Sequence, residues 1–195
     1  ILPNDFRLTV FLIKFEKNSR YMITEVKQST LPKTLEEFLL WEPEDGFKYE
    51  WNDGELIKFE GMKKKEYYIY GILNRLFFEK KYIEKGSLIS EPDVMLTGIQ
   101  MRRPDIAYFS YEQQDAGRNG EDVIPEFVIE LISFNDEFEK VETKLTEYFK
   151  AGVKVVWHIL PQNQLVYVYT GRKQVKICTD DDICSAAPVL PEFEI

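Results

Sequence analysis

Two short apolar runs of this sequence each carry one acidic residue, and this pattern restricts the possible folds most. Asp105 opens the run Asp105-Ile106-Ala107-Tyr108-Phe109, and Glu130 lies inside Phe127-Val128-Ile129-Glu130-Leu131-Ile132. Short runs rich in β-branched and aromatic residues are typical of strands. A carboxylate in such a run is costly unless a cation, a proton or hydrogen bonds compensate it. We therefore expect one compensating group for both acids, and a divalent metal ion is the hypothesis we favour.

The other residue types limit the kind of metal. The chain has one histidine, His158, which we expect to be structural, and two cysteines, Cys178 and Cys184, which form no Cys-x-x-Cys motif. A zinc site with soft ligands is therefore not expected. We predict a hard cation bound through oxygen, Mg²⁺ or Mn²⁺. No secretion signal is recognised, so both cysteines are expected to be reduced thiols.

Helical and strand patterns alternate along the chain. Helices are predicted over residues 34–41, 65–84 and 135–151. The predicted strands cover residues 8–15, 47–51, 55–59, 87–90, 94–96, 105–109, 127–132, 153–160, 165–169 and 174–178. The polar segment 112–122 is expected to be a mobile loop. This order predicts an α/β (α+β) fold in which helices flank one mixed sheet.

Length and charge limit the organisation further. We interpret residues 31–195 as a single domain and residues 1–30 as an N-terminal extension of uncertain status. No apolar run reaches the roughly 18 residues of a membrane span, so no membrane association and a cytoplasmic location are expected. The net charge of −9 argues against a dedicated nucleic-acid binder without excluding one. Local basic pairs such as Arg102-Arg103 are expected on the solvated surface.

A lysine on the helix after the second acid is predicted to face the two carboxylates. Four apolar residues are expected on the inner face of this helix: Phe138, Val141, Leu145 and Phe149. At about 100° per residue, Lys144 lies roughly 60° from Val141, whereas Lys140 lies roughly 100° away on the solvent side. The wheel therefore predicts that Lys144 leans over the sheet toward the acids and that Lys140 does not.

Carboxylates, a hard cation and an ammonium group are the components of metal-assisted phosphodiester hydrolysis. Glu50, in Lys48-Tyr49-Glu50-Trp51, is a further acid within an aromatic run. The spacing alone leaves structural roles open for each residue. Asp105 suits a turn cap, and Glu130 suits a pair with a buried base. Lys144 suits a helix flank with its ammonium in water, and Glu50 suits a cross-strand charge pair.

Several motifs, in order along the chain, resemble the Uma-type restriction endonuclease family of the PD-(D/E)XK nuclease superfamily. Tyr49-Glu50-Trp51-Asn52-Asp53-Gly54-Glu55-Leu56 resembles the family's "yELidGel". The later matches are Arg103-Pro104-Asp105-Ile106-Ala107 with "RPDia", Val128-Ile129-Glu130-Leu131-Ile132-Ser133 with "vvEvlS", and Lys144-Leu145-Thr146-Glu147-Tyr148 to Ala151-Gly152-Val153 with "Kl.eY..aGV". The resemblance covers roughly residues 31–195, nearly everything after the N-terminal extension.

The resemblance implies a restriction-endonuclease-like core, Mg²⁺ dependence and a DNA substrate. It implies that Asp105 and Glu130 are metal ligands, that Glu50 is a further acid near the metal, and that Lys144 is the catalytic lysine. In the superfamily pattern the lysine lies two residues after the second acid, where this chain has Ile132. Duplex cleavage needs two sites, so a homodimer is expected.

One departure from the family pattern and the acidic net charge keep other functions open. The family often has a histidine near the start of the long helix, where this chain has Glu66. Together with the acidic net charge, this supports a second hypothesis, a nuclease-fold protein without activity that serves as a binding or assembly module. A third, a hydrolase with a carboxylate pair such as a glycosidase, is disfavoured by the lysine and by the motifs.

Overall fold

The computed structural model describes residues 31–195, so the strand predicted over residues 8–15 lies outside the described residues. The largest sheet has six strands in the order β10-β9-β8-β7-β6-β3. They are β3 (Gly86–Ser90), β6 (Ile106–Ser110), β7 (Phe127–Leu131), β8 (Val155–Leu160), β9 (Leu165–Gly171) and β10 (Gln174–Thr179). Only β7 and β8 pair in parallel; the other neighbours in this sheet are antiparallel. The large sheet is therefore mixed, as the sequence predicts.

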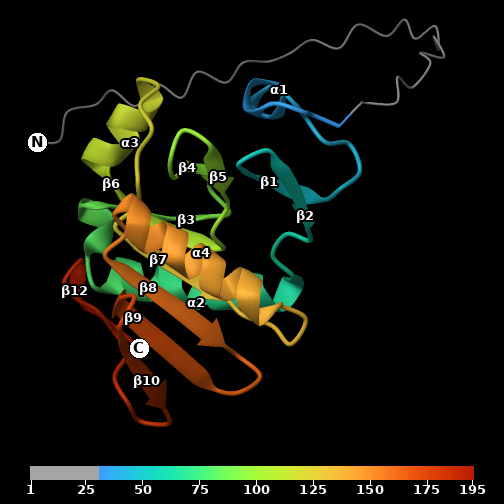
Figure 1. Cartoon of the computed structure of the whole chain (residues 1–195). Helices are drawn as coiled ribbons and strands as arrows, with labels where there is room; N and C mark the ends of the chain where they lie inside the picture. Colours follow the sequence, from blue (N-terminus) through green and yellow to red (C-terminus); the bar gives the residue numbers. More distant parts are fainter. Residues whose placement is uncertain (1–30) are drawn as a thin grey trace, which may run out of the picture. The chain divides into compact units, whose positions relative to one another are not determined.

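A second sheet of four antiparallel strands lies beside the first (Figure 1). It contains β1 (Lys48–Asn52), β2 (Glu55–Phe59), β4 (Val94–Met95) and β5 (Gln100–Arg102), and the chain ends in a hairpin of β11 (Ser185–Ala186) and β12 (Leu190–Glu194). The prediction of one sheet was therefore wrong. Strands as short as β5 and β11 are too brief to give an alternating pattern that sequence analysis can recognise.

The helices are α1 (Leu35–Leu39), α2 (Lys64–Glu79), α3 (Tyr111–Arg118) and α4 (Phe138–Ala151), with a 3₁₀ turn, η1 (Tyr82–Glu84). The predicted mobile loop over 112–122 was wrong, because α3 occupies most of it. Ser110 and Gln113 form a capping box that starts this polar helix. The helix predicted over 65–84 ends early, since Lys81 adopts a left-handed conformation with φ 61°.

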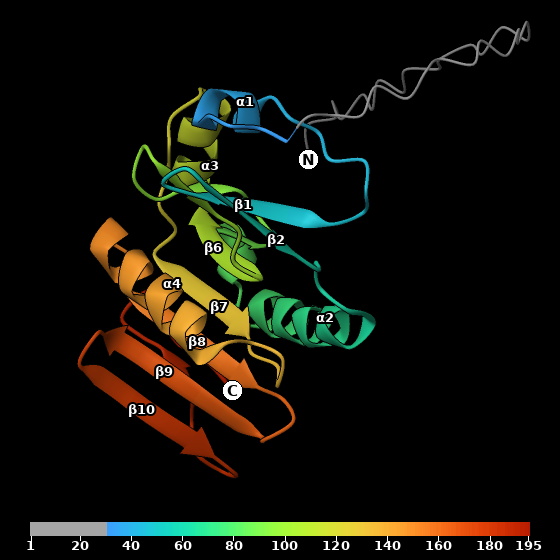
Figure 2. The ribbon, with the colours of Figure 1, turned by 45° about the vertical axis from the view of Figure 1, so that its right-hand side comes forward.

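The helix α4 lies over one face of the large sheet (Figure 2), and the sheet separates two layers of apolar packing. Alternate residues of β7 point to opposite faces: Ile129 packs with α2 and the C-terminal hairpin, whereas Val128 packs with α4 and β4. Glu130 shares the face of Val128 by the same alternation. The sheet therefore directs Glu130 toward α4, the helix that connects the two parallel strands.

Two large apolar side chains of the helices point into solvent, and the first of them, Phe138, was predicted to face the core. Phe138 is 77% exposed because it is the first residue of α4 and has no preceding helical turn to lie over. Ile72 is 59% exposed, since it lies about 100° around α2 from Leu73, which is buried. None of the helices within residues 31–195 is long and apolar enough to cross a membrane.

The packing of α4 generates a stability prediction. Leu145 is fully buried against the sheet, so Leu145→Ala should lower the free energy of unfolding by about 2–5 kcal/mol. Phe138→Ala, on the same helix, should change it by less than about 0.5 kcal/mol. Urea unfolding followed by circular dichroism measures both. Equal losses for the two variants would contradict the assignment of the buried face of α4.

Candidate active site

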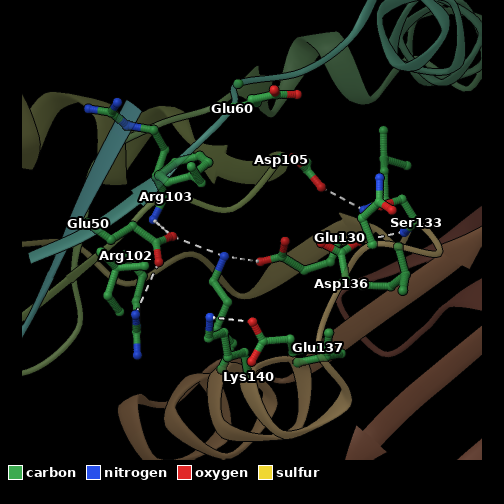
Figure 3. Close-up of a pocket in the computed structure, with 18 of the residues that line it drawn as sticks. Glu50, Glu60, Arg102, Arg103, Asp105, Glu130, Ser133, Asp136, Glu137 and Lys140 are labelled. Carbon is green, nitrogen blue, oxygen red and sulfur yellow. Dashed lines mark hydrogen bonds and ion pairs between the residues drawn. The ribbon is translucent and has the colours of Figure 1, made fainter. Parts of the chain in front are cut away.

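The four residues selected from the sequence line one cleft of about 860 Å³. Glu50 lies on β1, Asp105 directly precedes β6, Glu130 lies on β7, and Lys144 lies on α4. Figure 3 shows side chains from these elements converging on the cleft. The fold therefore brings together residues that are widely separated along the chain.

The Lys144 ammonium lies between two carboxylates. Its Nζ is 3.0 Å from Oε1 of Glu50 and 3.4 Å from Oε1 of Glu130. Lys140 instead pairs with Glu137 at 2.8 Å on the exposed side of the helix. The two lysines thus lie as the helical wheel predicts. Burial lowers the pKa of Lys144, but Glu130 and Glu50 outweigh it and raise the pKa, so the amine stays protonated.

Glu130 is buried and held from two sides. Its Oε1 accepts a hydrogen bond of 2.5 Å from the Tyr148 hydroxyl as well as the ion pair with Lys144. Burial nevertheless raises the pKa of the Glu130 carboxyl, while Lys144 and Tyr148 oppose the shift. The sequence analysis did not identify this contact of Tyr148 with the acid. The helical spacing from Lys144 was the available signal, since residues four apart share a face.

Asp105 ties the start of β6 to the end of β7. Its Oδ2 accepts a hydrogen bond of 2.6 Å from the backbone N–H of Leu131. Burial raises the pKa of Asp105 well above its usual range, and the nearby charge of Glu130 raises it further. Asp105 and Glu130 therefore form a pair of carboxylates that resists carrying two negative charges at once.

Glu50 differs from the other two acids because cations surround it. Its Oε2 lies 3.1 Å from Nη1 of Arg102, and its Oε1 accepts a hydrogen bond of 2.9 Å from the backbone N–H of Arg103. Burial raises the pKa of Glu50, but Lys144 and Arg102 outweigh it and hold the pKa below its usual range. Glu50 therefore stays ionised and forms an ion pair with Lys144.

Sequence analysis missed the roles of two charged residues at this site: Arg102, which lines the cleft, and Glu147, which lies next to it. Arg102, which was expected on the solvated surface with Arg103, is only 2% exposed. Its guanidinium binds the carboxylate of Glu147 through two nitrogens, with Nε–Oε2 2.7 Å and Nη2–Oε1 3.0 Å. The prediction for Arg102 was wrong because β5 is too short to reveal which of two adjacent arginines faces inward.

His158 also lines the cleft and is almost completely buried. It is paired in register with Glu130 on the neighbouring strand, and it packs edge-to-face on Tyr169 with ring centroids 5.0 Å apart. Among residues 31–195, no group hydrogen-bonds its Nε2. Burial and the charge of Lys144 lower the pKa of His158 to about 4, so the imidazole is neutral at pH 7.

The donor set suits a hard cation. Within residues 31–195, no three His, Cys, Asp or Glu side chains gather into a metal-binding group. Asp105 and Glu130 each use one oxygen for a hydrogen bond, which leaves Oδ1 and Oε2 to coordinate a cation. Mg²⁺ binds proteins through one or two carboxylates and keeps several waters. The remaining oxygens of these two carboxylates are therefore donors of the kind that Mg²⁺ or Mn²⁺ binds.

The raised pKa of Asp105 generates a prediction about stability. The folded protein holds this proton more tightly than the unfolded chain, so stability is lost as pH rises from about 4 through the folded pKa. Asp105→Asn should therefore raise the melting temperature at pH 7 in EDTA, and the gain should vanish near pH 4. Thermal melts across this pH range test it.

The control for these melts is Asp181→Asn, a change of one exposed acid outside the cleft. It should leave the melting temperature within the error of the wild type at both pH values. A lower melting temperature for Asp105→Asn at pH 7 would show that the ionised carboxylate stabilises the fold.

Comparison with known proteins agrees with this geometry. The family model described as "Uma2: Putative restriction endonuclease" matches residues 35–195. A crystal structure of a "putative nuclease belonging to DUF820" from Anabaena variabilis is similar in fold, with a TM-score of 0.67 at 22% identity over 83% of this chain and 91% of that chain. No curated protein matches the chain. The chain has a restriction-endonuclease-like fold and belongs to the Uma2 family of putative restriction endonucleases.

Proposed function

We propose that this protein is a divalent-metal-dependent endonuclease that hydrolyses phosphodiester bonds of DNA. The observation that carries the proposal is the placement of Asp105, Glu130 and the Lys144 ammonium in one cleft. Membership in a family of nuclease type and a fold shared with a nuclease support it. The homodimer and the cytoplasmic location expected from the sequence stay predictions.

Asp105 and Glu130 would hold the cation, Mg²⁺ or Mn²⁺. A cation bound there would polarise the scissile phosphate and lower the pKa of a bound water molecule. Both carboxylates are buried, so they are poorly hydrated and their mutual repulsion is strong. A cation bound between them would relieve this repulsion. The Leu131 N–H and the Tyr148 hydroxyl fix the direction of the two carboxylates.

Lys144 would stabilise the negative charge that develops on the phosphate. Its side chain is 23% exposed, which is enough to meet a substrate in the cleft while Glu50 and Glu130 hold it in place. Because its pKa is raised, the ammonium acts as a fixed positive charge and not as a proton acceptor. A preorganised charge of this kind contributes more in a site that excludes water.

One contact favours a second candidate function. Glu130 pairs directly with Lys144, so the lysine compensates this acid without a metal ion. The same arrangement would serve a nuclease-fold protein that binds or assembles without cutting. The two candidates differ in whether DNA is hydrolysed.

The proposal predicts that Asp105→Asn, Glu130→Gln and Lys144→Met each lower the rate of DNA cleavage at least about 100-fold. Nicking of supercoiled plasmid in Mg²⁺ or Mn²⁺, against an EDTA control, measures the rate. Lys150→Met, an exposed lysine on the same helix outside the cleft, should keep the wild-type rate. No cleavage by the wild-type protein with either metal would leave the binding module as the better account.

Metal binding generates a separate prediction. Millimolar Mn²⁺ should raise the melting temperature of the wild type, because a ligand that binds only the folded state stabilises it. Asp105→Asn replaces the charged ligand that we propose by a neutral one, so its melting temperature should respond much less. Calorimetric titration of Mn²⁺ gives the affinities of both proteins. Equal affinities would exclude Asp105 as a ligand, whatever the outcome of the cleavage assay.

A further inference from the structure

A buried arginine connects the small sheet to the helix that carries Lys144. Arg102 lies on β5, and its guanidinium binds Glu50 on β1 through Nη1 and Glu147 on α4 through Nε and Nη2. All three side chains are at least nine-tenths buried. Removing one partner from such a network leaves a buried charge without compensation, so the three groups act as a unit.

A second layer of hydrogen bonds fixes the Glu147 carboxylate. Gln100, also on β5, donates from Nε2 to Oε1 of Glu147 at 3.1 Å and to Oδ1 of Asn52 at 2.8 Å. Glu147 thus accepts hydrogen bonds from two residues of the short strand β5, Gln100 and Arg102. These contacts hold α4 against the small sheet at a defined point.

This point is one helical turn from Lys144. Residues three apart lie on the same side of a helix, so Glu147 and Lys144 both face the small sheet. Arg102 therefore acts on the lysine in two ways: it fixes the helix through Glu147, and it orients Glu50, whose other oxygen lies 3.0 Å from Lys144 Nζ.

We infer that Arg102 and Glu147 form a positioning pair that aims the Lys144 ammonium at the acids of the cleft. Neither residue needs to touch substrate for this role. The planar guanidinium contacts two carboxylates at fixed angles, which a lysine at this position cannot do. The catalytic consequence of the pair depends on the proposed nuclease function, whereas its effect on the order of Lys144 does not.

Two sets of variants test the positioning pair. Arg102→Lys keeps the charge and loses the planar geometry, and Glu147→Gln keeps the shape and loses the charge. The double variant Arg102→Met/Glu147→Leu replaces the pair by apolar side chains of similar volume, a change that buried ion pairs often tolerate. Glu50 loses Arg102 in this variant but keeps its ion pair with Lys144, so its charge stays compensated. The matched control is Arg172→Lys. Arg172 forms an ion pair near the surface with Glu142 of α4, and the distance from Nη1 to Oε2 is 3.0 Å.

The first readout is the ammonium signal of Lys144 in ¹H–¹⁵N NMR spectra, assigned by its loss in Lys144→Met. A held, ion-paired ammonium gives a visible signal at low temperature, so the wild type and Arg172→Lys should show it. All variants of the positioning pair should lose or broaden it. A sharp, unshifted signal in the folded double variant would overturn the inference. This readout needs no activity.

The second readout is cleavage kinetics in Mn²⁺. The variants of the pair should lower kcat about 10- to 100-fold, the cost of a misplaced catalytic group. KM for the plasmid and the Mn²⁺ affinity should stay within about threefold, because the metal ligands remain. Wild-type kcat in the folded double variant would also overturn the inference. If the wild type does not cut, the proposed function fails while the NMR readout still decides the positioning role.

Discussion

The compensation of buried carboxylates is the interaction on which this structure depends. Glu50, Glu130 and Glu147 lie inside the protein, and only two cations of the described chain, Lys144 and Arg102, contact them there. In a medium of low polarity such charges repel strongly unless they are paired. The mixed sheet, the small sheet and α4 each contribute a member of this set, so the ion pairs help to define how these three elements meet.

The compensation is uneven, and this unevenness suits a catalytic site. Burial raises the pKa of all three acids. At Glu50, Lys144 and Arg102 outweigh burial and the pKa falls, whereas at Asp105 and Glu130 the nearby cations do not outweigh it and the pKa values rise. A deficit of positive charge at one place in the interior is the electrostatic condition for binding a cation. The fold keeps this deficit although it opposes stability, which is typical of functional sites.

The longer strands, and the placement of the two acids and the lysine beside one cleft, could be predicted from the sequence, because each rests on a regular period. The apolar runs around Glu130 and the helical spacing of Lys144 are local patterns that tertiary contacts do not reverse. Arg102 could not be assigned in this way: its burial depends on Glu147 and Glu50, which come from other elements. The α3 segment was misjudged because its polar composition outweighed the capping box at Ser110.

The position of Lys144 on a crossover helix has a consequence for folding. The hairpins β1–β2 and β9–β10 join neighbours in the sequence and can form early, whereas the parallel pair β7–β8 forms only after α4 has crossed the sheet. The ammonium therefore reaches the acids late, when the long-range contacts are complete. A partly folded chain would hold its acids and its lysine apart, so the cleft with its charged side chains would exist only in the assembled domain.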